Sequence, residues 1–275
     1  MKRAASSLLL FALAVGACNS EEGPVLTLPS DPQAVVLSVQ SVGGFAPPEF
    51  LLSRVPRFTL LADGTLISEG PQIMLFPGPF LPNLQTSRID EETMQGVLEY
   101  VEGIGFPDID VERNDEAALF IADAPDDVVT YVDEGGEHIF SVYGLTIYER
   151  FTDARVLQLR DLVRLLENSA FASTPIGTYH GEVVQVIAGV SEFPPEPAVG
   201  NVRPWPLPVP FDELEEVFGG WRCRTFAGTE AQTLLSVFTT ANQVTTWDLD
   251  GVQYRLIGRP LLPGETGCET LKGSG

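Results

Sequence analysis

Basic side chains are scarce in this chain of 275 residues, which carries 16 Lys and Arg against 38 Asp and Glu, for a net charge of −22. Proteins that bind nucleic acid use a positive surface to neutralise phosphates. The acidic balance therefore excludes a general nucleic-acid-binding function. It favours a solvated surface, which could attract cations or a basic partner.

Histidines and catalytic motifs are equally scarce. Only His138 and His180 could serve as the base of a Ser-His-Asp triad. His138 falls in an expected strand and is interpreted as an ordinary sheet residue, whereas His180 falls in a turn-like stretch over residues 177–181. The chain contains no GxSxG or HExxH motif. We expect no catalytic residues, no metal and no cofactor.

Long apolar runs are absent after the N-terminus, where one short run follows two basic residues. Lys2 and Arg3 precede an apolar stretch over residues 4–17, which is too short for a lasting membrane span. The stretch ends in Val15-Gly16-Ala17-Cys18, which resembles the lipobox of bacterial lipoproteins. The resemblance implies cleavage before Cys18 and a diacylglycerol thioether on its sulfur. The alternative is an ordinary secretory leader with an incidental cysteine.

These features predict the location of the protein. We expect a lipoprotein signal peptide over residues 1–17 and a polar tether over residues 18–33. Two acyl chains on Cys18 would hold the protein at the extracytoplasmic face of the cell membrane. The membrane is then the first expected partner, through the lipid.

Two cysteines, Cys223 and Cys268, remain once Cys18 is assigned to the lipid. Outside the cytoplasm, an even pair is interpreted first as a disulfide. A free nucleophilic thiol or a metal ligand is the alternative, although no CxxC spacing occurs and both histidines are distant in sequence.

Hydrophobic periodicity predicts an α+β fold in two units, each with antiparallel strands or hairpins packed against one or two helices. In the first unit, over residues 34–172, Asp90 is the expected N-cap of a helix that Gly105 ends. Thr152 or Asp153 opens a second helix. Strands are expected at residues 34–42, 57–62, 65–69, 117–122, 128–133 and 137–143.

The second unit is expected over residues 173–275. It contains a proline-rich segment at residues 194–210 and a short helix at residues 211–218. Thr229 is expected to form a capping box with Gln232 at the start of the next helix. Strands are expected at residues 181–189, 244–249 and 252–258.

The C-terminal run CRTFAGTEAQTLLSVFTTANQVTTWDLDGVQYRLIGRPLLPGETGC is similar to the end of a group of uncharacterised exported lipoproteins from high-GC Gram-positive bacteria. Its marks are a cysteine before a short helix, an RPLLP-like motif and a terminal cysteine. The resemblance implies an envelope location and a bridge between Cys223 and Cys268. It implies nothing catalytic.

An acidic cluster over residues 108–116 invites a calcium site, because carboxylates at alternate positions suit that ion. Arg113 stands where an EF-hand loop has glycine, and Leu119 stands at the twelfth position, where it cannot ligate. A solvated loop is the favoured interpretation.

Two apolar, proline-rich loops are the candidate sites for a partner or ligand. Residues 71–82 contain Met74, Phe76 and Phe80, and residues 202–211 contain Trp205. If exposed, they would form a binding patch, and if folded back, they would pack between the units. The second outcome is favoured.

Two functions remain open. The first is a lipid-anchored binding or scaffolding module for an envelope protein or a small molecule. The second is a cell-wall hydrolase acting through carboxylates, which predicts a cleft where one carboxyl group has a raised pKa.

Overall fold

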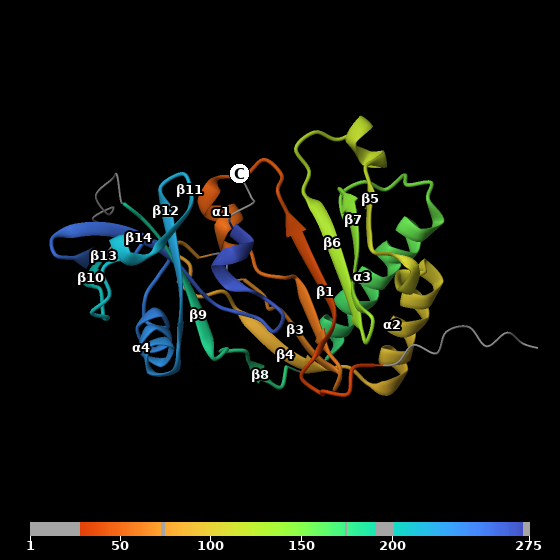
Figure 1. The fold of residues 1–275 in the computed structure, drawn as a ribbon, viewed down its shortest axis with the longest axis horizontal. Helices are drawn as coiled ribbons and strands as arrows, with labels where there is room; N and C mark the ends of the chain where they lie inside the picture. The colour runs from red at the N-terminus through yellow and green to blue at the C-terminus, as the bar shows by residue number, and fades with distance from the viewer. Residues whose placement is uncertain (1–27, 73–74, 174, 191–200, 272–275) are drawn as a thin grey trace, which may run out of the picture.

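Two β-sheets, with helices packed against each, organise the protein (Figure 1). The computed structural model describes residues 28–72, 75–173, 175–190 and 201–271. Sheet neighbours are mostly antiparallel, and the helices lie outside the sheets instead of alternating with parallel strands. The expected α+β class is confirmed.

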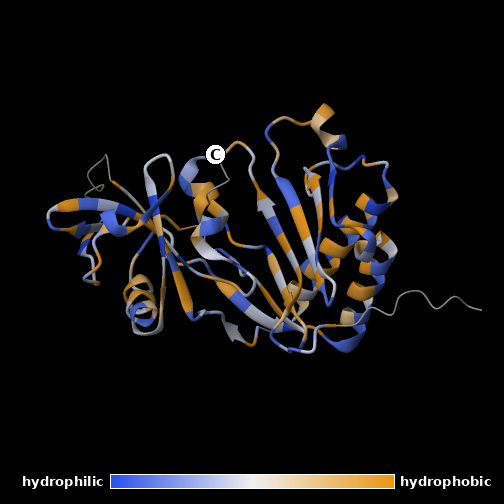
Figure 2. Ribbon diagram, viewed as in Figure 1, coloured by the Kyte–Doolittle hydropathy of each residue, from blue (hydrophilic) through white to orange (hydrophobic). Residues whose placement is uncertain are grey.

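The first sheet is built from the strands within residues 35–178. They are β1 (Val35–Val42), β2 (Phe58–Leu61), β3 (Thr65–Glu69), β4 (Leu84–Arg88), β5 (Val111–Asn114), β6 (Asp126–Asp133), β7 (Gly136–Tyr143) and β8 (Gly177–Thr178). Their order in space is β5-β7-β6-β1-β2-β3-β4-β8. The neighbours are antiparallel except β5 and β7, which run parallel. Burial alternates along β6, as expected for a strand with two different faces, and Figure 2 shows both orange and blue residues in the strands of this sheet.

Helices α2 (Glu91–Ile104) and α3 (Ala154–Ala172) lie side by side against one face of this sheet (Figure 1). The Asp90 carboxylate accepts a hydrogen bond from the Thr93 amide at 2.8 Å, so the expected N-cap is confirmed. Gly105 ends α2 with φ of +80°, a conformation that suits glycine. Helix α3 begins after Asp153 and buries the stripe Val156, Leu159, Leu162, Val163 and Leu166.

The second sheet contains β9 (Val183–Val190), β10 (Val202–Pro204), β11 (Glu215–Phe218), β12 (Trp221–Ala227), β13 (Thr246–Leu249) and β14 (Val252–Pro260). Their order is β10-β13-β14-β9-β12-β11. Helix α4 (Gly228–Phe238) packs on one face, where Leu234 and Phe238 join a core with Phe211 and Trp247.

The other face of the second sheet meets the first unit. Leu52 of helix α1 (Pro48–Ser53) packs against Ile187 of β9. Leu262, which follows β14, packs against Ile67 and Leu84 of the first sheet. Apolar contacts therefore join the two units.

Three local expectations were wrong. Residues 117–122 form no strand, because the 3₁₀ turn η2 (Glu116–Leu119) places Ala117 in the core and leaves Leu119 exposed. Residues 211–218 form a 3₁₀ turn, η3 (Phe211–Glu213), followed by the edge strand β11, so sheet pairing overrides the helical pattern. Helix α4 begins directly after Ala227, which leaves Thr229 inside its first turn without a capping hydrogen bond.

The division between the sheets lies slightly beyond the expected unit boundary at residue 173. Strand β8 pairs with β4 and completes the first sheet, and β9 opens the second. Within the described residues, no helix has both the length and the apolar character that crossing a membrane requires.

Candidate binding site

The described part of the loop between β3 and β4 reaches across to the second unit. The Gln243 amide donates a hydrogen bond to the Gly78 carbonyl at 3.0 Å, and Pro79 forms a β-bridge with Asn242. The Phe80 ring lies 4.5 Å from that of Phe238 between centroids. The loop therefore joins the units, as the favoured interpretation of residues 71–82 predicts.

Gly258 makes this contact sterically feasible. A Cβ atom at that position would lie 2.6 Å from the Phe238 ring and 2.7 Å from the Phe80 ring. Any side chain there would displace one of the two aromatic rings. The glycine thus fixes where the loop docks on the second unit.

A cavity of about 390 Å³ lies beside Phe80, between the loop and helix α4. Its size falls within the range of small-molecule sites. Most of its lining side chains are nonpolar, and they come from both units. The cavity is lined by Pro71, Gln72, Pro79, Phe80, Leu81, Pro82, Asn83, Thr178, Tyr179, His180, Leu235, Phe238, Thr239 and Pro260.

The polar groups of this cavity are partly engaged in the protein. The Tyr179 hydroxyl donates to the Leu261 carbonyl at 2.8 Å, and the Asn83 amide donates to the Pro71 carbonyl. Burial of the Tyr179 phenol, helped by the charges of Glu265 and Glu182, raises its pKa to about 12. The Tyr179 hydroxyl is therefore neutral at physiological pH, and its hydrogen bond to Leu261 holds the ring in place at the side of the cavity.

His180 lies at the rim of the cavity, and its side chain is exposed. No described carboxylate makes a hydrogen bond or ion pair with its ring, so the triad arrangement that a catalytic base needs is not assembled around it.

A second hollow, of about 530 Å³, adjoins the cavity at Gln72, which lines both. It contains two guanidinium groups, those of Arg54 and Arg57, and the carboxylate of Glu69. The other lining residues are Ser41, Phe50, Ser53, Val55 and Pro125.

Arg54 is held in place within this second hollow. Its Nη1 donates to the Gly43 carbonyl at 2.7 Å and approaches the Ser41 carbonyl at 3.4 Å. Its guanidinium carbon lies 5.1 Å from the centroid of the Phe50 ring, a cation–π contact. Arg57 instead donates to Glu167 of α3 at 2.8 Å.

Glu69 is the one carboxylate among the described residues that line this second hollow. Although its side chain reaches solvent, the surrounding walls displace enough water to raise the pKa of its carboxyl group. The positive charge of Arg57 acts in the opposite direction without cancelling the shift.

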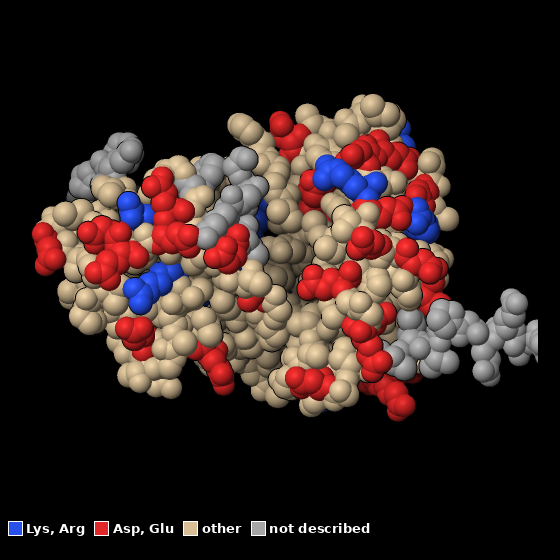
Figure 3. Space-filling model, viewed as in Figure 1, with Lys and Arg blue, Asp and Glu red and all other residues tan. Residues whose placement is uncertain are grey.

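A third hollow, of about 640 Å³, also borders α1 and shares Phe50 and Ser53 with the second and Phe80 with the cavity. Phe76 lines it with 64% of its surface exposed. The Arg255 guanidinium and the Glu49 carboxylate, 3.5 Å apart, close one side. Figure 3 shows the surface hollowed between the two units, with red acidic side chains on both.

The four candidate loop residues have different outcomes. Phe76 is exposed, and Phe80 is half-buried between the units. Trp205 is 7% exposed, and its Nε1 donates to the Val209 carbonyl at 3.0 Å, so its loop folds back as the favoured interpretation predicts, although into the core of the second unit and not between the units. The proline-rich chain around Trp205 folds back because its rings fill the space beside Trp247. Met74 lies outside the described residues, as does Cys18.

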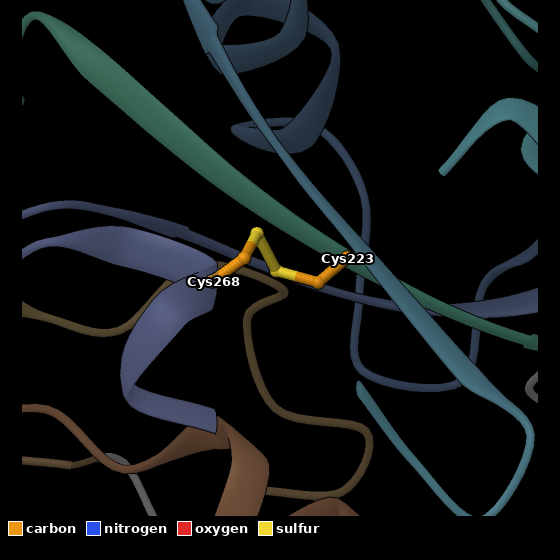
Figure 4. Close-up of a disulfide and its surroundings, with 2 residues drawn as sticks. All are labelled: Cys223 and Cys268. Atoms are coloured by element: carbon orange, nitrogen blue, oxygen red, sulfur yellow. A yellow bond between two sulfur atoms is a disulfide. The ribbon is translucent and has the colours of Figure 1, made fainter. Parts of the chain in front are cut away.

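Cys223 and Cys268 form a disulfide with an S–S distance of 2.02 Å, as the sequence predicts. Figure 4 shows it joining β12 to the start of η4 (Gly267–Leu271), the last described 3₁₀ turn. Cys223 is 1% exposed and packs with Leu52 of α1. The bridge is therefore part of the contact between the units.

The acidic stretch over residues 108–116 has partners within the protein. Glu112 accepts hydrogen bonds from the Arg155 guanidinium, Asp115 pairs with Arg113, and Glu116 accepts the Thr152 amide. In the part of the chain that the structure describes, no group of three or more His, Cys, Asp or Glu residues is arranged to hold a metal.

The sequence did not indicate Arg54, Arg57, Glu69 or Leu235 as site residues. Arg54 and Arg57 lie between α1 and β2, Glu69 ends β3 and Leu235 lies on α4, and the fold brings them around the loop over residues 71–83. Compared with known proteins, the chain matches no family model, no curated protein and no solved structure.

Proposed function

We propose that the protein is a lipid-anchored extracytoplasmic binding protein whose ligand is a small molecule with a substantial nonpolar part. The observation that carries this proposal is the 390 Å³ cavity, walled by nonpolar side chains of both units. Small-molecule sites are concave, mostly apolar and frequently placed between units of a fold. At the cavity, no described carboxylate pairs with the His180 ring, which favours binding over histidine-dependent covalent chemistry there.

The anchor belongs to the same proposal. The basic residues Lys2 and Arg3, the apolar stretch over residues 4–17 and the lipobox-like Val15–Cys18 support it. We expect the native protein to begin at Cys18 with fatty-acid mass on its sulfur. Replacing Cys18→Ala should release the protein from the membrane fraction, and retention there would contradict the anchor.

Binding can be tested with the uncharged amphiphile 1-dodecanol by titration calorimetry. Leu235→Trp would fill part of the cavity with an indole ring, and Gln232→Trp would put the same side chain on the exposed face of α4 as a matched control. We expect at least about tenfold weaker binding for Leu235→Trp and no change for Gln232→Trp. Equal binding by both folded variants, or no binding by the unmodified protein, would overturn the proposal.

A second candidate function rests on Glu69. A carboxyl group with a raised pKa in a hollow is the feature that a carboxylate-dependent cell-wall hydrolase requires. The described walls of that hollow supply no second carboxylate for such a mechanism. Turnover of cell-wall fragments that disappears in Glu69→Gln would establish this alternative, and a lack of turnover by the unmodified protein would remove it.

A further inference from the structure

We infer that the ligand is an anionic amphiphile, with its nonpolar chain in the 390 Å³ cavity and a carboxylate or phosphate head beside Arg54. This inference rests on the proposed binding function and specifies its ligand class. It follows from the adjacency of a nonpolar cavity and a hollow that contains guanidinium groups.

The two hollows are adjacent. Gln72 lines both the nonpolar cavity and the hollow of Arg54. The third hollow borders both as well, because it shares Phe80 with the cavity and Phe50 with the hollow of Arg54. An elongated molecule that passes Gln72 would contact both environments.

Arg54 is the residue suited to hold the head. Two backbone carbonyls and the Phe50 ring fix its guanidinium group, so little side-chain entropy remains to be lost on binding. Its Nε and Nη2 have no hydrogen-bond partner among the described residues, and these two atoms form the planar fork that matches a carboxylate or phosphate.

The charged side chains around Arg54 determine where in the second hollow the anionic head group of the ligand binds. Glu69 would repel an anion, and Arg57 already donates to Glu167. The head therefore lies at the Arg54 end, away from Glu69. The chain as a whole carries a net charge of −22, so most of its surface repels an anionic head group. The Arg54 guanidinium, with donors available, attracts the head group to one place on that surface.

The test compares four probes below their micelle concentrations: dodecanoate, dodecyl phosphate, 1-dodecanol and inorganic phosphate. We expect the two anionic amphiphiles to bind the unmodified protein about tenfold more tightly than 1-dodecanol does. Inorganic phosphate alone should bind weakly, since it lacks the nonpolar chain. A preference between dodecanoate and dodecyl phosphate would identify the head.

Variants separate the head contact from the cavity. Arg54→Gln should lose the tenfold preference and keep its affinity for 1-dodecanol, which also shows that the variant is folded. Arg54→Lys should recover most of the preference, because it keeps the charge. Arg164→Gln removes the same charge from an exposed pair on α3 and should change nothing. Glu69→Gln should strengthen binding of dodecanoate.

The outcomes distinguish the two proposals. Equal binding of dodecanoate and 1-dodecanol, with both blocked by Leu235→Trp, would overturn the anionic head and leave the binding function intact. Dodecanoate binding that depends on Arg54 but is unaffected by Leu235→Trp would overturn the placement of the chain in the cavity. Failure of all four probes would overturn both.

Discussion

The two units fill their cores in different ways. The first sheet is covered by two regular helices, α2 and α3, whose buried residues recur at helical spacing. The second sheet has one helix, α4, and completes its core with an irregular segment carrying Trp205, Leu207 and Phe211. Its opposite face is closed by α1 from the first unit and by the disulfide-linked η4.

This difference has a consequence for stability. In the first unit, burial is spread over many equivalent contacts along two helices. In the second unit, a few specific contacts hold irregular segments: the disulfide, the Phe80 docking and a buried ion pair. Single substitutions at these contacts should therefore destabilise the protein strongly, and they provide tests of the comparison.

The largest effect is expected at the buried ion pair between Arg259 of β14 and Glu265 in the segment after it. The Arg259 Nη1 and Glu265 Oε2 atoms lie 2.8 Å apart, and the two side chains are 4% and 13% exposed. Glu265 also accepts the Leu262 amide at 2.7 Å, which positions Leu262 against the first sheet. Arg259→Met should lower the free energy of unfolding by about 3–5 kcal/mol, because it leaves a buried carboxylate unpaired.

Urea denaturation measures this loss of unfolding free energy. A double variant tests whether the loss comes from the unpaired charge. Arg259→Met combined with Glu265→Gln should cost less than the sum of the single changes, since neither charge is then left alone. Arg164→Met, at an exposed ion pair of the first unit, should stay within about 0.5 kcal/mol of the unmodified protein. Equal losses for Arg259→Met and Arg164→Met would contradict the proposed contrast.

The disulfide should have the next largest effect. Cys223→Ala with Cys268→Ala should lower the free energy of unfolding by about 2–4 kcal/mol, because the unfolded chain regains the freedom of a loop of 45 residues. A reductant should lower the urea midpoint of the unmodified protein to that of the double variant. It should leave the double variant unchanged, and a reductant effect there would indicate another cause.

The helix starts of the two units offer a smaller, matched comparison. Asp90 caps α2 through the Thr93 amide, whereas Thr229 makes no capping bond in α4. Asp90→Ala should cost about 1 kcal/mol of unfolding free energy, and Thr229→Ala should cost only a few tenths. A larger loss of unfolding free energy for Thr229→Ala in the same experiment would support the capping box that the sequence predicts at Thr229.

The same contrast explains what the sequence could predict. The helices capped by Asp90 and Asp153 follow from local patterns. So do the β2–β3 and β13–β14 hairpins, because Asp63-Gly64 and Asp250-Gly251 are dipeptides typical of tight turns, with positive φ at Gly64, Asp250 and Gly251. Local periodicity suffices there because each element buries one regular face. It failed at residues 211–218, where Glu215 pairs with Cys223 of β12 and the sheet edge decides the conformation.

The candidate site was predictable only in part. Proline and aromatic content singled out the loop with Phe76 and Phe80, because such residues in a loop need a surface to pack against. The identity of that surface, with Phe238 and Gly258, depends on chain pairing across the two units. The guanidinium group of Arg54 carries no sequence signal, since its role depends on the carbonyl of Gly43 and the ring of Phe50.

The smallest expected effect is a pH dependence in the first unit, at His138. Its Nδ1 lies 2.6 Å from the Ile109 carbonyl and its Nε2 lies 3.2 Å from the Asp133 carboxylate. Both partners accept hydrogen bonds, so only the protonated ring can donate to both. Burial opposes the charge on the ring, but these bonds and the carboxylates of Asp133 and Asp110 raise the pKa of His138 above 6.5.

The sign of the pH effect follows from that direction. A raised pKa in the folded state stabilises the protein fully below pH 6.5, and the contribution is lost as the pH rises through the folded-state pKa. Unfolding free energies should therefore fall by less than about 1 kcal/mol between about pH 5.5 and about pH 8.5 through this residue. His138→Gln should remove that part of the slope. Identical slopes for the unmodified protein and His138→Gln would show that the ring carries no charge-dependent contact in the folded first unit.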